Sequence, residues 1–269
     1  MTFITPKTFA VGEVLSAVDM NVFVRDNTAA LNVGFRFLAR RIFDTPGTFT
    51  FSKADPMGNG SVDGSIIRAY RIICVGGGGG GAGGQATGAN QCNPASGGSS
   101  GGYAERFALS SVYPDSVEVK VGAAGAAGTG ANGASGEGTQ FNVGLPGSVS
   151  ATGGDGGRVF VNVVEPPAVS QNSFLPSSGL VGDITDAGEV GKGSLCILVQ
   201  GSGFSTGGTG GGGRFGTGGP GNPSGVGASF SNAQGFGGGG GGRSVPTAST
   251  AAATGGSATG GLVIVELYA

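Results

Sequence analysis

The distribution of glycine constrains the fold of this chain more than any other feature. The sequence has 62 glycines among 269 residues, and only six of them precede residue 75. Ordering a glycine costs about 0.5–1 kcal/mol more than ordering an alanine, so an ordered body needs compensating contacts. The chain therefore divides into an ordinary-looking head and a glycine-rich body. Three structures are compatible with the composition of that body: a flexible linker, strands joined by long glycine loops, or packed polyglycine-II helices.

Regularly placed apolar stretches in the body argue against a flexible linker. Residues 116–121 (SVEVKV) alternate apolar and polar side chains, which is typical of a half-buried strand. Further strands are predicted at 48–51, 65–75, 158–164, 194–199 and 262–268. We therefore predict a mainly β fold, in which strands alternate with long glycine loops. Packed polyglycine-II helices are the finer alternative, since neighbouring helices could satisfy one another's backbone groups.

The head has the pattern of a short helical segment. Ser16 followed by Asp19 resembles a capping box, which predicts a helix from Ala17 toward Ala30. Beyond it, apolar side chains recur at intervals of four, three and four residues, at Leu31, Phe35, Leu38 and Ile42. This seam would either pack on its own domain or serve for attachment and oligomerisation.

An internal repeat suggests how the body is organised. The stretches 136–141 and 225–230 are similar, and each precedes a glycine cluster that closes on an arginine, Arg158 or Arg243. We interpret the body as a diverged duplication. The expected units are an N-terminal attachment or oligomerisation segment, 1–47; a first glycine-rich β domain, 48–165; a connector, 166–190; and a second glycine-rich copy, 191–269.

Charge and residue usage exclude several classes of function. The 14 Lys and Arg residues are balanced by 16 Asp and Glu, so no basic stripe for nucleic acid is expected. There is no histidine, which removes the commonest general base and metal ligand. Asp183, Asp186 and Glu189 could bind calcium or act as a carboxylate pair, but a solvated loop explains them as well. We expect no enzyme, no cofactor, no metal site and no membrane insertion.

The three cysteines, Cys74, Cys92 and Cys196, form neither a disulfide framework nor a zinc motif. At most one pair can form, and three free thiols is the simpler expectation, in keeping with assembly in a reducing cytoplasm. The absence of a recognisable signal peptide agrees with this expectation. Cys74 lies in an apolar strand, where a thiol behaves as a small buried hydrophobe.

Polar excursions between glycine tracts are the candidate recognition surface. They lie at residues 85–94, 219–224 and 244–250, and a rigid scaffold would present them outward. Ordinary turns are the alternative interpretation. The candidate receptor-binding residues are Gln85, Asn90, Gln91, Asn93, Tyr103, Asn222 and Thr247.

The chain resembles structural proteins of tailed bacteriophages. Residues 5–31 (TPKTFAVGEVLSAVDMNVFVRDNTAAL) are similar to the N-termini of minor tail and fibre proteins. The Val75-Gly76 junction, the elements 101–103 and 138–141, and the closing strand resemble glycine-rich tail domains and tail-fibre tip adhesins built on polyglycine-II helices. The tracts here are shorter and more interrupted than in those adhesins.

The resemblance implies a virion protein of a tail fibre, spike or tail tip, assembled in the host cytoplasm. Its partners would be other tail or fibre proteins, further copies of itself, most simply as a trimer, and a bacterial surface glycan or outer-membrane protein. A purely structural virion component is the main alternative. An ice-binding or matrix protein and a polysaccharide-degrading spike are further alternatives, and the spike would need the carboxylates at 183–189.

Overall fold

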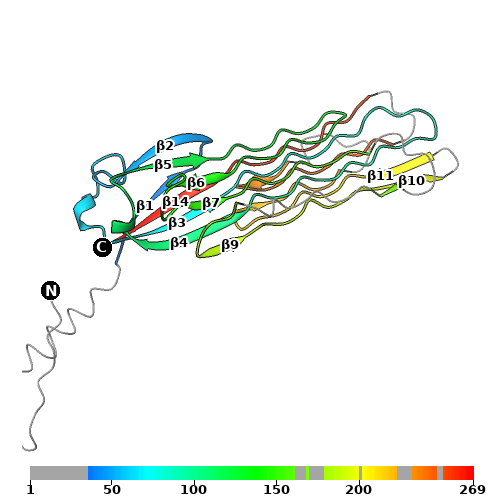
Figure 1. The fold of residues 1–269 in the computed structure, drawn as a ribbon. Coiled ribbons are helices and arrows are strands. Elements are labelled where there is room, and N and C mark those ends of the chain that lie inside the picture. The colour runs from blue at the N-terminus through cyan, green and yellow to red at the C-terminus, as the bar shows by residue number, and fades with distance from the viewer. Residues whose placement is uncertain (1–35, 161–167, 170–178, 200–201, 223–231, 247–250) are drawn as a thin grey trace, which may run out of the picture.

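The fold is described by a computed structural model for residues 36–160, 168–169, 179–199, 202–222, 232–246 and 251–269. The described chain is elongated: β1, where it begins, and the C-terminus share one end, and β10 and β11 lie at the other (Figure 1). It is mainly β with almost no helix, which confirms the predicted class. The helical residues described form two 3-10 turns, η2 (Gly64–Ile66) and η3 (Ser110–Val112).

Two antiparallel sheets form the end that carries the C-terminus, which we call the base. The first sheet has the order β1 (Phe37–Phe43), β14 (Leu262–Tyr268), β3 (Ala69–Val75), β4 (Tyr103–Leu109) and β9 (Ile184–Asp186). The second has the order β2 (Gly47–Ser52), β5 (Ser116–Val121), β6 (Thr139–Phe141) and β7 (Val149–Ala151). The last strand of the chain is thus a central strand of the first sheet.

Alternation of side chains explains why these segments pair face to face. On β5, Val117, Val119 and Val121 are buried, and the intervening side chains point outward. They pack against the buried face of β3 and β14, together with Phe51 and Phe141, in one continuous core. The base is therefore a β-sandwich with an aromatic centre.

The glycine segments continue the strands of the base as a bundle of parallel and antiparallel runs (Figure 1). Residues 76–84, which follow β3, make backbone hydrogen bonds with a period of three. Every third N–H, from Gly76, Gly79 and Ala82, donates to the segment 96–102 at 2.9–3.1 Å. The next N–H in each triplet donates to 131–137, and the third donates to 256–259 from Gly78 and Gly81.

The carbonyls of the same run are bonded to a different set of neighbours. Those of 77–82 accept N–H groups from the segments 125–128, 154–157 and 240–243 at 2.8–3.0 Å. Residues 76–84 are therefore surrounded by six segments from distant parts of the sequence. A Cβ added at any residue from 76 to 81 would lie 1.8–2.1 Å from a backbone carbonyl oxygen, so only glycine permits this spacing.

Two small sheets complete the described body. A three-stranded sheet at the distal end has the order β11 (Ser202–Thr206), β10 (Leu195–Val199) and β8 (Ala168–Val169). A two-stranded sheet pairs β12 (Gly216–Thr217) with β13 (Gln234–Gly235).

The predicted strands are matched at β2, β3, β5, β10 and β14, but 158–164 is not a strand in its described part. Residues 158–160 contribute one isolated bridge, from Val159 to Ala95, and 161–164 lie outside the described residues. Of the described elements, none is a helix long and apolar enough to span a bilayer.

The helical seam predicted in the head is wrong where it can be checked. Leu38 and Ile42 belong to β1, which pairs with β14 along its length. Leu38 packs partly against the core, and Ile42 is exposed. Strand pairing with the otherwise open edge of β14 outweighs the helical spacing of four isolated apolar side chains. Leu31, Phe35 and the predicted 17–30 helix lie outside the described residues.

Candidate functional site: the distal loops

The polar excursion at 85–94 lies at the distal end and is anchored at both of its ends. Before it, Gly84 donates its N–H to the carbonyl of Arg243 at 2.8 Å. Near its C-terminal end, Asn93 and Val245 exchange two backbone hydrogen bonds, of 3.1 and 3.0 Å. The excursion is therefore held against the segment 243–246, although about 150 residues separate the two in sequence.

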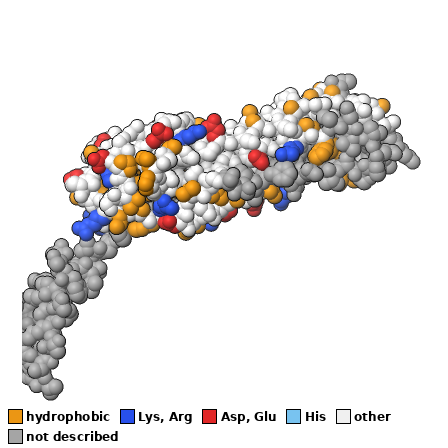
Figure 2. All heavy atoms as spheres, in the orientation of Figure 1, with side chains coloured by type: hydrophobic (Ala, Val, Ile, Leu, Met, Phe, Trp, Pro, Cys, Tyr) orange, Lys and Arg blue, Asp and Glu red, His pale blue; other side chains and the backbone are white. Residues whose placement is uncertain are grey.

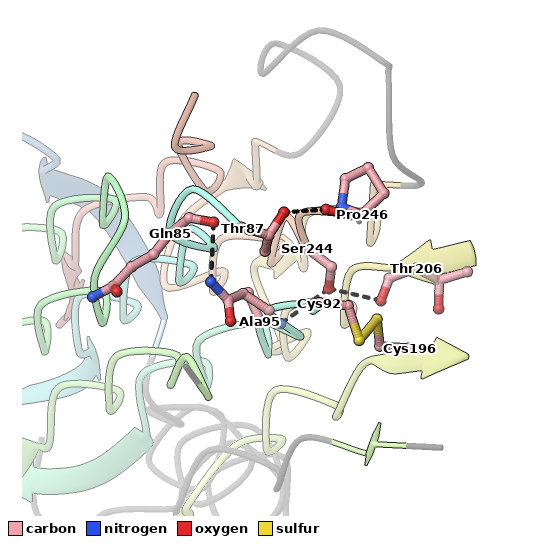
Figure 3. The surroundings of a disulfide bond; sticks show 9 residues. Gln85, Thr87, Cys92, Ala95, Cys196, Thr206, Ser244 and Pro246 are labelled. Carbon is pink, nitrogen blue, oxygen red and sulfur yellow. Dashed lines mark hydrogen bonds between the residues drawn. A yellow bond between two sulfur atoms is a disulfide. The ribbon is translucent and has the colours of Figure 1, made fainter. Parts of the chain in front are cut away.

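Side-chain hydrogen bonds also hold the loop against the segment 243–246 (Figure 3). The Asn93 amide donates from Nδ2 to the carbonyl of Gln85 at 3.1 Å, which closes the loop on itself. The Thr87 hydroxyl donates to the carbonyl of Pro246. The Ser244 hydroxyl accepts the N–H of Ala95 and donates to a carbonyl of β11, both at 3.0 Å. These bonds satisfy polar groups that the glycine packing buries.

A disulfide between Cys92 and Cys196 ties the loop to β10 (Figure 3). Their Cα atoms are 6.5 Å apart, and 104 positions separate them in sequence. The expectation of three free thiols is therefore wrong, because the packed segments bring two distant cysteines together at one end of the molecule. Cys74 is the remaining free thiol and is buried, as predicted.

Three of the predicted receptor-binding residues lie on the outward part of this loop. Gln85 and Asn90 are exposed, and Gln91 is half-buried. Asn90 has φ +58°, the left-handed conformation that asparagine adopts more readily than most residues. Gln91 accepts the N–H of Gly88 through Oε1 at 3.0 Å, which shapes the turn.

The other predicted contact residues are not brought to this surface. Asn93 and Asn222 are 0% and 3% exposed, so their side chains serve the scaffold and do not face solvent. Tyr103 begins β4 at the base and is 5% exposed. Thr247 lies outside the described residues. The residues that sequence reasoning missed are the disulfide pair and Ser244, whose roles depend on long-range packing that leaves no local signal.

The three acidic side chains at 183–189 do not act as one group, because each has a different partner. Asp183 pairs with Arg106 at 3.2 Å, Asp186 pairs with Arg214 at 3.5 Å, and Glu189 accepts the N–H of Gly212 at 3.1 Å. Among the described residues, no group of His, Cys, Asp and Glu side chains is arranged to hold a metal ion.

The distal loop has no charged residue between 85 and 95. Figure 2 shows that most visible charged side chains lie over the base. A surface of amides, hydroxyls and backbone groups can recognise a partner through hydrogen bonds and shape, with little dependence on salt. No protein-family model matches the chain, and no curated protein matches it.

Proposed function

We propose that this chain is a bacteriophage virion protein of a tail fibre, spike or tail tip whose distal loops recognise the bacterial surface. The observation that carries the proposal is the position of an uncharged polar loop, held by a disulfide and reciprocal hydrogen bonds, at the end opposite the base. β1, which belongs to the predicted attachment segment 1–47, lies in the base, where attachment to other tail or fibre proteins would leave the loop outermost. The likeness of residues 5–31 to phage tail proteins supports the same assignment.

We further propose that the glycine segments are packed polyglycine-II helices. The three-residue period of the bonds from 76–84 supports this, because such a helix has three residues per turn and no internal hydrogen bonds. The close approach of carbonyl oxygens to the glycine Cα atoms supports it too. A bundle of this kind is a rigid spacer that would hold the loop away from the particle.

Binding of the purified full chain to susceptible cells tests the proposed function. Asn90→Gly removes the side chain and keeps the positive φ, and Gln85→Ala removes a second exposed amide. We expect the double variant to bind cells at least about tenfold more weakly, since each lost hydrogen bond is worth about 1 kcal/mol. Thr50→Ala, on the exposed side of β2, is the matched control and should bind normally.

The alternative is a purely structural virion component without receptor contact. It predicts no binding to cells by the wild-type chain. It also predicts immunogold label on the capsid or tail tube, whereas recognition predicts label at a tail tip or fibre end. Sedimentation of the purified chain would test the proposed trimer separately.

A further inference from the structure

We infer that a cavity at the junction of the base and the glycine body binds a neutral saccharide unit. This inference rests on the proposed function, because it specifies a surface glycan as one of the molecules recognised. The cavity has a volume of about 470 Å³ and lies between the end of the first sheet and the segment 210–218. Pockets for small ligands commonly measure about 300–1,000 Å³, so the space suits one or two sugar rings.

Residues of three neighbouring strands form one wall of this cavity. Val75 at the end of β3 is paired with Tyr103 of β4, and Tyr103 is paired with Asp186 of β9. These three side chains therefore occupy adjacent positions on the outer face of the first sheet. The wall is fixed by strand register and does not depend on a loose loop.

The charged groups of the cavity are oriented by other contacts. The Arg214 guanidinium lies 4.3 Å from the ring centroid of Tyr103 and 3.5 Å from the Asp186 carboxylate. The second oxygen of Asp186 accepts the N–H of Gly188 at 2.9 Å. Glu189 is held by the N–H of Gly212. Donors and acceptors thus converge on one space with little freedom to reorient.

Glycine forms most of the remaining lining. The lining glycines are Gly101, Gly188, Gly210, Gly212, Gly213, Gly216 and Gly218. Unlike the glycines of the packed bundle, Gly212 and Gly213 could each carry a Cβ in ordinary van der Waals contact, with nearest atoms at 3.5 and 3.7 Å. At these two positions the missing side chains leave room for a ligand, and close packing does not explain them.

The chemistry of the lining selects among ligand classes. Two carboxylates against one guanidinium disfavour a phosphate or another anion. Carboxylates accept hydrogen bonds from hydroxyls in pairs, and a guanidinium donates to ring or hydroxyl oxygens. Phe215 lies in an adjoining hollow that Arg214 and Gly216 also line. It stacks against Tyr103 at 6.2 Å and is 37% exposed, so it offers an apolar surface beside the cavity for the C–H face of a sugar. A neutral polyhydroxylated ring fits this combination.

Saturation-transfer NMR on the full chain tests the inference with defined probes: maltose, lactose and N,N′-diacetylchitobiose. We expect at least one to bind. Gly213→Leu should fill the cavity, and Asp186→Asn with Glu189→Gln should remove both negative charges and replace one acceptor oxygen of each carboxylate with an NH2 donor. Each of the two variants should bind at least about tenfold more weakly. Gly60→Asn is the matched control and should bind normally, because Gly60 has an exposed left-handed conformation and an added Cβ would meet no atom within 4 Å.

Two outcomes overturn the inference: no probe binds the wild-type chain, or binding survives in both cavity variants. Circular dichroism of each variant shows whether a loss of binding is a loss of fold, and the carboxylate variant avoids the bulk added by Gly213→Leu. Cell binding separates the two proposals. Saccharide binding without cell binding retains the cavity and rejects the proposed function, whereas loop-dependent cell binding without saccharide binding does the reverse.

Discussion

The Cα atom of Gly80 faces the backbone carbonyl of Ala126 so closely that a Cβ there would lie 2.0 Å from the carbonyl oxygen. Gly80 also donates its N–H to Ala134 and accepts the N–H of Gly157, so it is bonded on two other sides. An added methyl group can be accommodated only if bonded segments separate. We expect Gly80→Ala to lower the free energy of unfolding by about 3 kcal/mol or more, measured by denaturant titration.

Gly213→Ala is the matched control for this prediction, because its Cβ would meet no atom closer than 3.7 Å. It should leave the free energy of unfolding within about 0.5 kcal/mol of the wild-type value, as for most surface changes. Equal effects of the two substitutions would show that glycine is not required by packing at Gly80.

Reduction of the Cys92–Cys196 disulfide should destabilise the distal end. A disulfide that closes a long loop stabilises a protein by about 2–4 kcal/mol, and this one spans 104 positions. We expect Cys92→Ser with Cys196→Ser to lower the free energy of unfolding by an amount in that range and to expose the 85–94 loop to proteolysis. Thiol titration of the unfolded, unreduced wild-type chain should find one reactive thiol, from Cys74; three would contradict the pairing.

Tyr70 makes the sandwich sensitive to high pH. Burial raises the pKa of Tyr70 from 10.0 to about 12, and among the described residues its hydroxyl has no hydrogen-bond partner. The folded state therefore holds the phenolic proton more tightly than the unfolded state. The ionisation of Tyr70 therefore costs no stability below pH 10. As the pH rises from 10 toward 12, it lowers the free energy of unfolding.

Tyr70→Phe removes this titration and keeps the edge-to-face contact of the ring with Phe51, whose centroid is 5.5 Å away. We expect stability at pH 7 to stay within about 1 kcal/mol of the wild-type value or to rise, because no bond is lost. Thermal melts between pH 7 and 11.5 should show a shallower alkaline decline. Tyr113, whose pKa burial also raises to about 12, leaves a residual slope.

Arg71 links three strands on the outer face of the first sheet. From β3 it donates Nε to Glu105 of β4 at 2.6 Å and Nη1 to Glu266 of β14 at 3.2 Å. The hydrogen bond from Arg71 is the main reason that the pKa of Glu105 lies below its ordinary value. The stabilisation from Glu105 is therefore present above pH 4.5 and is lost as the pH falls through the lowered pKa.

We expect Arg71→Gln to cost about 1–2 kcal/mol at pH 7, because two carboxylates are left without their shared cation. The difference from the wild type should shrink as the pH falls through the lowered pKa of Glu105, because that carboxyl is then neutral in both proteins. Arg71→Lys retains the charge without the planar fork and should fall between the two. A cost that is independent of pH would point to lost packing rather than to the ion pairs.

The strands of the base could be predicted because their signal is local. Residues 116–121 alternate apolar and polar side chains, and β5 buries and exposes them in the same alternation. β14 begins with four consecutive apolar residues. Other elements gave no such signal. β6 and β7 have three residues each and depend on register with β5, and β1 carries a spacing that suggests a helix.

The candidate site was predictable only in outline. Polarity between glycine tracts identified the 85–94 loop, but not that Asn93 faces inward or that Cys92 meets Cys196. The sequence offers Tyr103 as a candidate receptor-binding residue. The structure instead places it in the wall of a cavity, beside Arg214 from a segment more than 100 residues away.

The sequence by itself determined that this protein is mainly β, that its strands run into glycine, and that the loop at 85–94 is polar and uncharged. These properties follow from composition and from periodicity within a few residues. The tertiary structure alone decided which six segments surround residues 76–84, which cysteines pair, and where a cavity remains open. Glycine has no side chain with which to specify a neighbour, so the partners of each tract are set by the registers of the strands that lead into it.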